Sequence, residues 1–328
     1  MRRSFHHRLV NGPFEDTSMY LRILHAKRAL LFDAGDTAGL SPGDIMKISE
    51  LFISHTHIDH FIGFDSILRV LLKRPEPLDI YGPPGIIEAV EHKIGGYTWN
   101  RIREYPVKLD VFSIEGDALR HVRFYAEHGF TLKEMGLARA SVLADEVLVK
   151  EDDFSVSAIM LDHDMPCVAY SVEEPVYVNV IRTVLEAMGL VVGPWLRDLK
   201  SAVRRGEPDG FELFAGSAKI SLGELRGAIS TRQRQKVTYV TDANPTPDNI
   251  DRITEFSRGA TTLYCEACFL DADRARAIER NHLTGAMAGS IARNAGVQKL
   301  VPMHFSTRYL GESRTPADEA LEVFENGG

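Results

Sequence analysis

The six residues from His55 to His60 carry the most concentrated chemistry in the sequence. They read His-Thr-His-Ile-Asp-His, so three imidazoles and one carboxylate occupy six positions. Apolar residues at 51–53 and 61–64 flank them, which predicts that they lie at the end of a buried strand. Imidazole nitrogens and carboxylate oxygens are ligands that zinc and similar divalent ions bind in proteins. The spacing favours a metal site that can serve two adjacent ions over a solvated cluster of surface histidines.

Three further candidate donors each follow an apolar run later in the chain. They are His163, Asp242 and His304. Each alone is ambiguous, because a histidine at a strand end is often a hydrogen-bonded structural residue and an aspartate there can be a turn former. Together with the first cluster they give about seven donors. Two neighbouring metals need a shared carboxylate, and Asp242 is the expected bridge.

The elements that must position these donors are short strands alternating with helices. Apolar runs predict strands at 29–33, 50–54, 78–82, 107–114, 121–126, 154–161, 167–172, 236–240, 262–264 and 299–303, and helices at 62–72, 84–94 and 285–294. Donors that follow several strands indicate a layered α/β fold whose site opens along one edge of packed sheets.

One segment, residues 173–230, interrupts this pattern. It is rich in Gly and Pro around a short amphipathic stretch at 195–203. We expect a single hydrolase domain over residues 1–328, with 173–230 as an inserted arm; a surface subdomain that only supports the fold is the alternative. Between residues 180 and 205 there are five basic residues (Arg182, Arg197, Lys200, Arg204, Arg205) and two acidic ones (Glu186, Asp198).

Composition bounds the class of protein. The chain has 328 residues, 44% of them hydrophobic, and a net charge of −8, which argues against a protein that coats nucleic acid over its whole surface. No apolar stretch approaches the roughly 18 residues of a membrane span, and the start lacks the apolar segment of a signal peptide, so we expect a cytoplasmic protein with no membrane partner. Three cysteines, Cys167, Cys265 and Cys268, cannot form a disulfide framework and are expected to be buried structural thiols.

Several segments resemble the metallo-β-lactamase superfamily and, within it, ribonuclease Z, the family of endonucleases that trim the 3′ trailer from precursor tRNA. Residues 281–286 and 299–309 look like the family's His-x-Thr and His-Phe-Ser-x-Arg-Tyr segments. Residues 161–163 and 264–269 look like two more of its signatures, and 189–200 is similar to the Gly-Pro segment of its flexible arm. The resemblance covers most of the chain and implies an αββα sandwich with an inserted arm.

The resemblance also implies a role for each site residue. His55, His57 and His163 would hold one ion, Asp59, His60 and His304 the other, and Asp242 would touch both. The ions would be two Zn2+, although Mn2+ or Fe2+ accept similar donors. Asp59 would orient and deprotonate the attacking water, His282 would act as general acid, and Glu266 would position His282. In the arm, Arg197 and Lys200 would bind tRNA, and the protein would be a homodimer.

Two questions stay open at this level. Arg308 can contact a substrate phosphate, or it can pair with a carboxylate of the fold. The family commonly has Leu and Gly where this chain has Thr56 and Ile58, and usually begins with segments that are absent here. The substrate can therefore be precursor tRNA or a smaller phosphodiester, a cyclic nucleotide or an ester. A metal-stabilised binding protein without catalysis is a third reading.

Overall fold

The computed structural model describes residues 4–24, 26–138, 147–175, 177–232 and 234–326. These residues belong to two compact units. The first consists of 1–150, 156–172 and 236–328, and the second of 151–155 and 173–235. All seven candidate metal donors belong to the first unit, whereas Arg197 and Lys200 belong to the second.

Two sheets form the centre of the first unit. In the described part of the chain the larger sheet has eight strands in sequential order: β1 (Phe5–Leu9), β2 (Met19–Ile23), β3 (Arg28–Phe32), β4 (Ile48–Phe52), β5 (Leu78–Gly82), β6 (Lys108–Glu115), β7 (Ala118–Tyr125) and β8 (Thr131–Ala138). The smaller sheet runs β18 (Leu300–Met303), β17 (Thr262–Glu266), β16 (Lys236–Val240), β11 (Pro166–Glu173), β10 (Ser155–Asp162) and β9 (Val147–Lys150). The predicted strands at 78–82 and 236–240 are confirmed with their bounds.

Aromatic side chains join the inner faces of the two sheets. Phe32 and Phe52 stack in register on neighbouring strands, with ring centroids 5.0 Å apart. Tyr170 of the smaller sheet packs against both rings, at 5.9 and 5.3 Å, and donates its hydroxyl proton to the carbonyl of Ile53. Burying a large apolar side chain stabilises a fold by about 1.5–3 kcal/mol, so this contact holds the two sheets face to face beside the strand ends that carry the donors.

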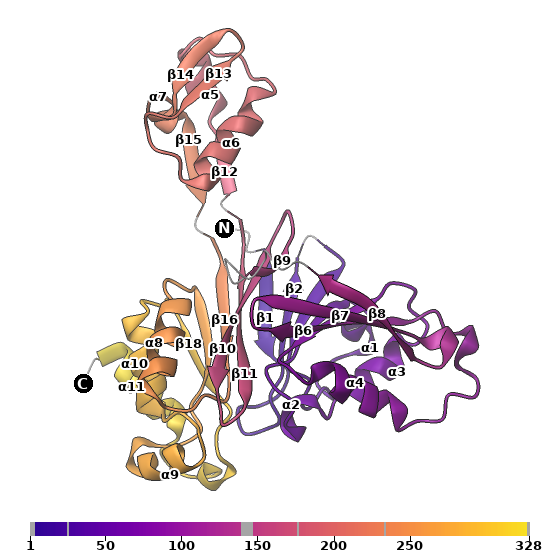
Figure 1. Ribbon diagram of the computed structural model, residues 1–328. Helices are drawn as coiled ribbons and strands as arrows, with labels where there is room; N and C mark the ends of the chain where they lie inside the picture. The colour runs from indigo at the N-terminus through magenta and orange to yellow at the C-terminus, as the bar shows by residue number, and fades with distance from the viewer. Residues whose placement is uncertain (1–3, 25, 139–146, 176, 233, 327–328) are drawn as a thin grey trace. The chain divides into compact units, whose positions relative to one another are not determined.

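Helices cover the two outer faces of the sandwich (Figure 1). Against the larger sheet lie α3 (Phe64–Leu71) and α4 (Ile86–Gly95), and against the smaller one α8 (Pro247–Phe256), α10 (Gly285–Asn294) and α11 (Pro316–Asn326). Short helices α1 (Pro42–Ile45), α2 (Ile58–Phe61) and α9 (Arg274–Glu279) lie in connections. The order of layers is helix, sheet, sheet, helix, as predicted.

Helix α10 has the predicted bounds for local reasons. Thr284 caps its N-terminus by accepting a hydrogen bond from the backbone N–H of Met287. A Cβ at Gly289 would lie 2.4 Å from the carbonyl oxygen of Ala320, so only glycine lets α10 approach α11 this closely. This packing fixes the start of α10, and with it the loop that carries His282.

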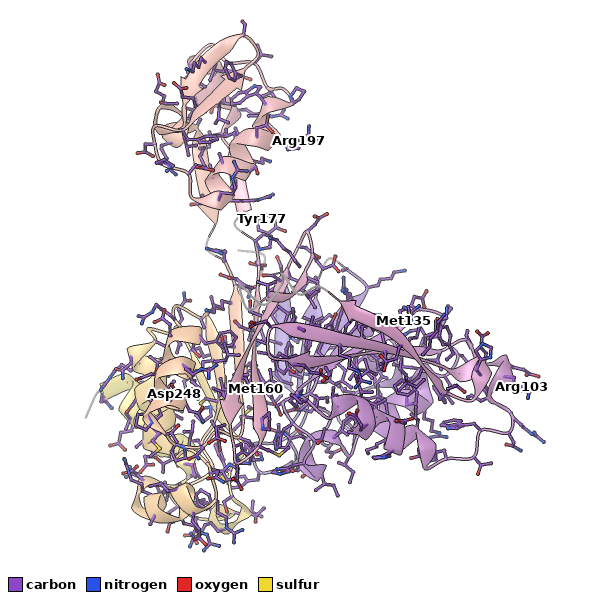
Figure 2. The ribbon with its side chains drawn as sticks, viewed as in Figure 1. Arg103, Met135, Met160, Tyr177, Arg197 and Asp248 are labelled. Atoms are coloured by element: carbon purple, nitrogen blue, oxygen red, sulfur yellow. The ribbon has the colours of Figure 1, made fainter. Side chains whose placement is uncertain are left out.

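The second unit has a small core of its own. Its elements are β12 (Tyr177–Val180), α5 (Arg182–Ala187), α6 (Trp195–Arg205), β13 (Glu212–Ala215), β14 (Ala218–Ser221), α7 (Leu222–Leu225) and β15 (Ile229–Arg232). Trp195, Leu199 and Ala202 recur at helical spacing on α6 and are buried in this core. Arg197 lies on the exposed side of the same helix (Figure 2).

The structure shows the state of the three cysteines and the lengths of the helices. Cys167, Cys265 and Cys268 are free and buried, as predicted. Among the described residues, none of the helices combines the length and the apolar character that crossing a bilayer requires.

Candidate metal centre

The candidate donors gather where strands of both sheets end. Strands β16, β17 and β18 are parallel neighbours, so their carboxyl ends meet at one edge and place Asp242, Glu266 and His304 together. His55 follows β4 in the other sheet, and His163 follows β10. The carboxyl-terminal edge of parallel strands is a common location for sites in α/β folds.

The loop from 55 to 60 turns directly into a helix. His57 is the N-cap residue of α2, and Asp59 and His60 lie within its single turn. His55 and His60 are buried, whereas His57 is exposed. Because α2 starts at once, side chains from both ends of the loop point to the same place: the rings of His55 and His60 have centroids 4.3 Å apart.

The structure brings all seven predicted donors into two neighbouring groups that share no member. Within each group the possible ligand atoms lie within 4.8 Å of one another. One group is His55, His57, His163 and Asp242, and the other is Asp59, His60 and His304. These are the two sets that the family resemblance implied, and Asp242 reaches both.

Asp242 lies at the centre of the histidines. Its Oδ2 is 3.5 Å from Nε2 of His55, of His60 and of His163, and its Oδ1 is 3.1 Å from Nδ1 of His304. In the described part of the chain, the buried Nε2 atoms of His55 and His60 and Nδ1 of His304 nevertheless lack a hydrogen bond of proper geometry. Buried polar atoms are normally satisfied, so nitrogens that converge without hydrogen-bonding fit a cation as their missing partner.

The charge states of His55 and Asp242 match such a cation. Burial lowers the pKa of His55 to about 2, which keeps its imidazole neutral and able to bind a metal. Burial acts in the same direction on His60, but the carboxylates of Asp242 and Asp33 outweigh it and raise its pKa well above the usual value. Burial opposes ionisation of Asp242, yet the neighbouring histidines, His304 first, hold its pKa well below its usual range. The carboxylate of Asp242 is therefore ionised.

A buried carboxylate that the sequence reasoning did not single out supports the loop. Asp33 accepts hydrogen bonds from the backbone N–H of Ser54 at 2.6 Å, from the hydroxyls of Ser54 and Tyr239 at 2.8 and 2.9 Å, and lies 2.9 Å from Nδ1 of His60. A carboxylate behind a histidine fixes the orientation of its ring. Its position in the sequence could have identified Asp33 as a site residue, because it directly follows β3, as the predicted donors follow their strands.

His163 is oriented by the main chain instead. Its Nδ1 lies 2.8 Å from the carbonyl oxygen of Asn281. A carbonyl only accepts, so Nδ1 carries the proton and Nε2 is free to face Asp242.

His282 and Glu266 form a separate pair beside the donors. Nδ1 of His282 lies 2.9 Å from Oε2 of the fully buried Glu266, whose Oε1 accepts a hydrogen bond from the backbone N–H of Ala243 at 2.5 Å. Burial would lower the pKa of His282, but the charge of Glu266 and the hydrogen bond to it raise that pKa to about 9. Cys268, which the sequence reasoning placed among structural thiols, has its Sγ within 4.8 Å of ligand atoms of His282 and His304.

Several residues around the cluster have a left-handed backbone. Asp33, Asp242 and His304 have φ of 54°, 44° and 60°. This conformation is unfavourable for residues with a side chain and is found where surrounding structure imposes it, often at functional sites. Each of the three comes directly or soon after a strand, so the turn directs its side chain into the cluster rather than along the sheet.

The predicted substrate-binding residues are placed differently. Nη1 of Arg308 is 3.3 Å from Oδ1 of Asp273, and its guanidinium lies over the ring of Tyr309, so it is engaged in the fold. Its contact with a phosphate stays a prediction. Arg197 and Lys200 lie on α6 of the second unit, and the side chain of neither has a hydrogen bond or ion pair to another described residue.

Comparison with known proteins decides the family. No family model matches the chain. A ribonuclease Z of Methanothermobacter thermautotrophicus is 30% identical over 302 residues, which are 89% of this chain and 81% of that relative. This chain belongs to the ribonuclease Z family. A ribonuclease Z of Deinococcus radiodurans is 28% identical over 306 residues, covering 92% of this chain and 90% of the relative.

Solved structures agree with the ribonuclease Z assignment at the level of the fold. The short form of human tRNase Z has a TM-score of 0.54 at 17% identity, covering 92% of this chain and 93% of its own. The metallo-β-lactamase fold protein YhfI of Bacillus subtilis has a TM-score of 0.55 at 16% identity, covering 98% and 93%. The predicted αββα metallo-β-lactamase sandwich is thus confirmed, and this ribonuclease Z family member has His/Asp clusters whose geometry could hold a metal ion.

Proposed function

We propose that this protein is a metal-dependent endoribonuclease that removes the 3′ trailer from precursor tRNA. The single observation that carries the proposal is the convergence of two donor groups on Asp242 with the His282–Glu266 pair beside them. Metal donors alone would also suit a binding protein. A further buried acid–base pair next to them is what hydrolysis of a phosphodiester needs.

Two divalent cations, Zn2+ in the first place and Mn2+ or Fe2+ as alternatives, fit the donor set. His55, His57 and His163 would hold one, Asp59, His60 and His304 the other, with Asp242 between them. When bound, such ions supply Lewis-acid chemistry that neutralises charge on the phosphodiester and makes water more acidic. The unpartnered nitrogens of His55, His60 and His304 support this assignment.

Asp59 is the residue that we assign to the attacking water. Its Oδ2 lies 3.3 Å from Nε2 of His304 and 3.4 Å from Nε2 of His60, and its side chain is 36% exposed. The carboxylate is thus anchored on the protein side and open to solvent on the other. It can orient a water and accept its proton in this position.

His282 is the residue that we assign to the leaving oxygen. Glu266 holds Nδ1 and stabilises the protonated ring, so Nε2 can donate a proton to the departing 3′-oxygen. Glu266 is itself held by the backbone of Ala243 next to Asp242. Two hydrogen bonds in series, from His282 to Glu266 and from Ala243 to Glu266, therefore fix the donor for the leaving group relative to Asp242.

The second unit is the part that we assign to binding the body of the tRNA. It has a separate core, and its helix α6 presents Arg197 and Lys200 on a protein that is acidic overall. Arg197 is exposed and Lys200 is half-buried, and cations at a protein surface contact phosphates in a salt-dependent way. By the same family resemblance we propose a homodimer. Arg308 is a further candidate for a phosphate contact if it leaves Asp273 when substrate binds.

Cleavage of a defined precursor tRNA by metal-depleted and metal-restored protein tests the proposal. We expect no cleavage after chelation, recovery with Zn2+, and a mature 3′ end that carries a hydroxyl. A small aryl phosphodiester in parallel assays tests the alternative substrate class. Turnover of the small diester without cleavage of any precursor would overturn the assignment to tRNA while leaving the metal centre in place.

A further inference from the structure

A pocket of about 700 Å3 lies next to the backbone of the segment that carries Asp59. Its walls come from the segments at 15–16 and 35–40, from Ile62 and Gly63, and from one side of α3. Six of the residues that line it are Asp16, Asp36, Leu40, Ile62, Ser66 and Arg69. Pockets of this volume hold small molecules or single building blocks of a polymer.

The pocket and the donor loop form one rigid piece of backbone. The N–H of Ala34 donates to the carbonyl of His60 at 2.8 Å, and the N–H of Gly63 donates to the carbonyl of Ala34 at 2.7 Å. A Cβ at Gly35 would lie 2.4 Å from the carbonyl oxygen of Asp59, so the pocket wall touches the chain that carries this donor. A ligand in the pocket therefore lies at a fixed position relative to the metal centre.

An apolar edge leads from the donors to the pocket. Ile58 and Ile62 are one helical turn apart, joined by a backbone hydrogen bond of 2.9 Å, and are 74% and 47% exposed. Large apolar side chains that are this exposed beside a charged centre suit a flat, unpaired base passing over them.

The charged side chains that line the pocket are one arginine, Arg69, and three carboxylates, those of Glu15, Asp16 and Asp36. Leu40 and Ile62 offer an apolar wall to a base. Arg69, near the C-terminus of α3, is exposed, and its side chain has no hydrogen bond or ion pair with any described residue, so its guanidinium can bind a phosphate in bidentate fashion. Asp16 and Asp36 can accept hydrogen bonds from the N–H groups of a base.

The position of His282 indicates which part of the RNA would occupy the pocket. Its ring lies 5.0 Å from the ring of His163 in one donor group and 5.5 Å from that of His304 in the other, and it does not line the pocket. The pocket wall instead contacts the backbone of the segment that carries Asp59 and His60. The 3′-oxygen of the tRNA body leaves at His282, so the strand on the other side of the scissile phosphate extends in the other direction. We infer that the pocket binds the first nucleotides of the 3′ trailer, with Arg69 on a trailer phosphate. This inference rests on the proposed function.

Two precursors with the same tRNA body test the inference, one with a trailer of a single nucleotide and one with a trailer of several. For the wild-type protein we expect a lower KM with the longer trailer. Arg69→Ala should raise the KM of the long-trailer precursor by about tenfold, as loss of one charge-assisted contact does, and so remove the difference. Arg22→Ala is the matched control, because Arg22 is an exposed arginine of β2 that does not line the pocket.

A binding measurement that needs no turnover completes the test. A labelled, 5′-phosphorylated trailer oligonucleotide should bind the wild-type protein and Arg22→Ala equally and Arg69→Ala about tenfold more weakly, by fluorescence anisotropy. Equal trailer dependence in Arg69→Ala and wild type, or an equal rise in KM for both precursors, would overturn the inference. If the wild-type protein cleaves neither precursor, the proposed function fails, and the oligonucleotide titration alone decides on the pocket.

Discussion

Two regions supply the seven candidate donors, and they reach the centre in different ways. The loop from His55 to His60 contributes four of them from six consecutive residues, on one turn that runs into α2. His163, Asp242 and His304 come singly, each just after a strand of the smaller sheet. The loop can be recognised in the sequence because four donors lie close together there. His163, Asp242 and His304 can be recognised as donors only once the packing of the strands brings them to the same place.

The two regions also differ in how they are held. The buried side chain of Asp33 supports the loop through Ser54 and His60. The strand-end donors depend on the main chain: His163 bonds to a carbonyl, and Asp242 and His304 have left-handed backbones. Single side-chain substitutions should therefore loosen the loop more easily than the strand ends, apart from the donors themselves.

The largest expected effect is that of Asp242→Ala. This residue lies within 3.5 Å of nitrogens of four histidines, so its loss removes the shared carboxylate and leaves those histidines without a counter-charge. We expect activity to fall by at least about ten-thousandfold, because several kcal/mol of charge stabilisation disappear. Elemental analysis should find less than half of the wild-type metal. The exposed loop residue His57 provides the comparison: if His57→Ala loses as much metal as Asp242→Ala, the strand-end donor is not central.

His282→Ala should have the next largest effect. Loss of a general acid costs about a thousandfold in kcat, while the seven donors remain. The metal content should stay at the wild-type value, which separates catalysis from binding. Since His282 also falls in a group with Asp242, Glu266 and His304, a loss of metal in this variant would instead make it a ligand.

Asp33→Asn should weaken the loop and spare the strand ends. The amide keeps the size of the side chain but removes the charge that holds His60, so metal affinity should fall by about tenfold to a hundredfold. Asn281→Gly is the control, because glycine keeps both the carbonyl that orients His163 and the left-handed φ of 59°. Competition with a chromogenic chelator measures the metal affinity of both variants. Equal affinities for the two variants would contradict the contrast between side-chain and main-chain support.

The smallest effect is expected outside the metal centre. Reversing both charges in Arg197→Glu/Lys200→Glu should raise the KM for precursor tRNA by about fivefold and flatten its salt dependence. The double substitution should leave turnover of a small aryl phosphodiester at the wild-type rate, because the second unit has its own core and carries none of the donors. Unchanged KM and salt dependence would remove these two residues from the binding surface.

Much of the fold was accessible from local patterns. Strands at 78–82 and 236–240 and the helix at 285–294 were predicted with their bounds, because buried apolar runs, a Thr cap and an Ala-rich segment are local signals. The strand at 50–54 was placed two residues late, since β4 is Ile48–Phe52. Strand β1 was not predicted: Phe5–Leu9 alternates too weakly, and its pairing with β2 defines it.

The sequence by itself determined the chemistry: which side chains can bind metal, that four of them share one turn, and which family the motifs resemble. Only the tertiary structure decided their partners. Asp33 supports His60 from 27 positions away, and Arg308 turned out to lie on Asp273. The chemical type of a donor follows from the identity of one residue. The residues that surround it depend on which strands pair and which sheets face each other. Those contacts join distant segments, so no local pattern encodes them.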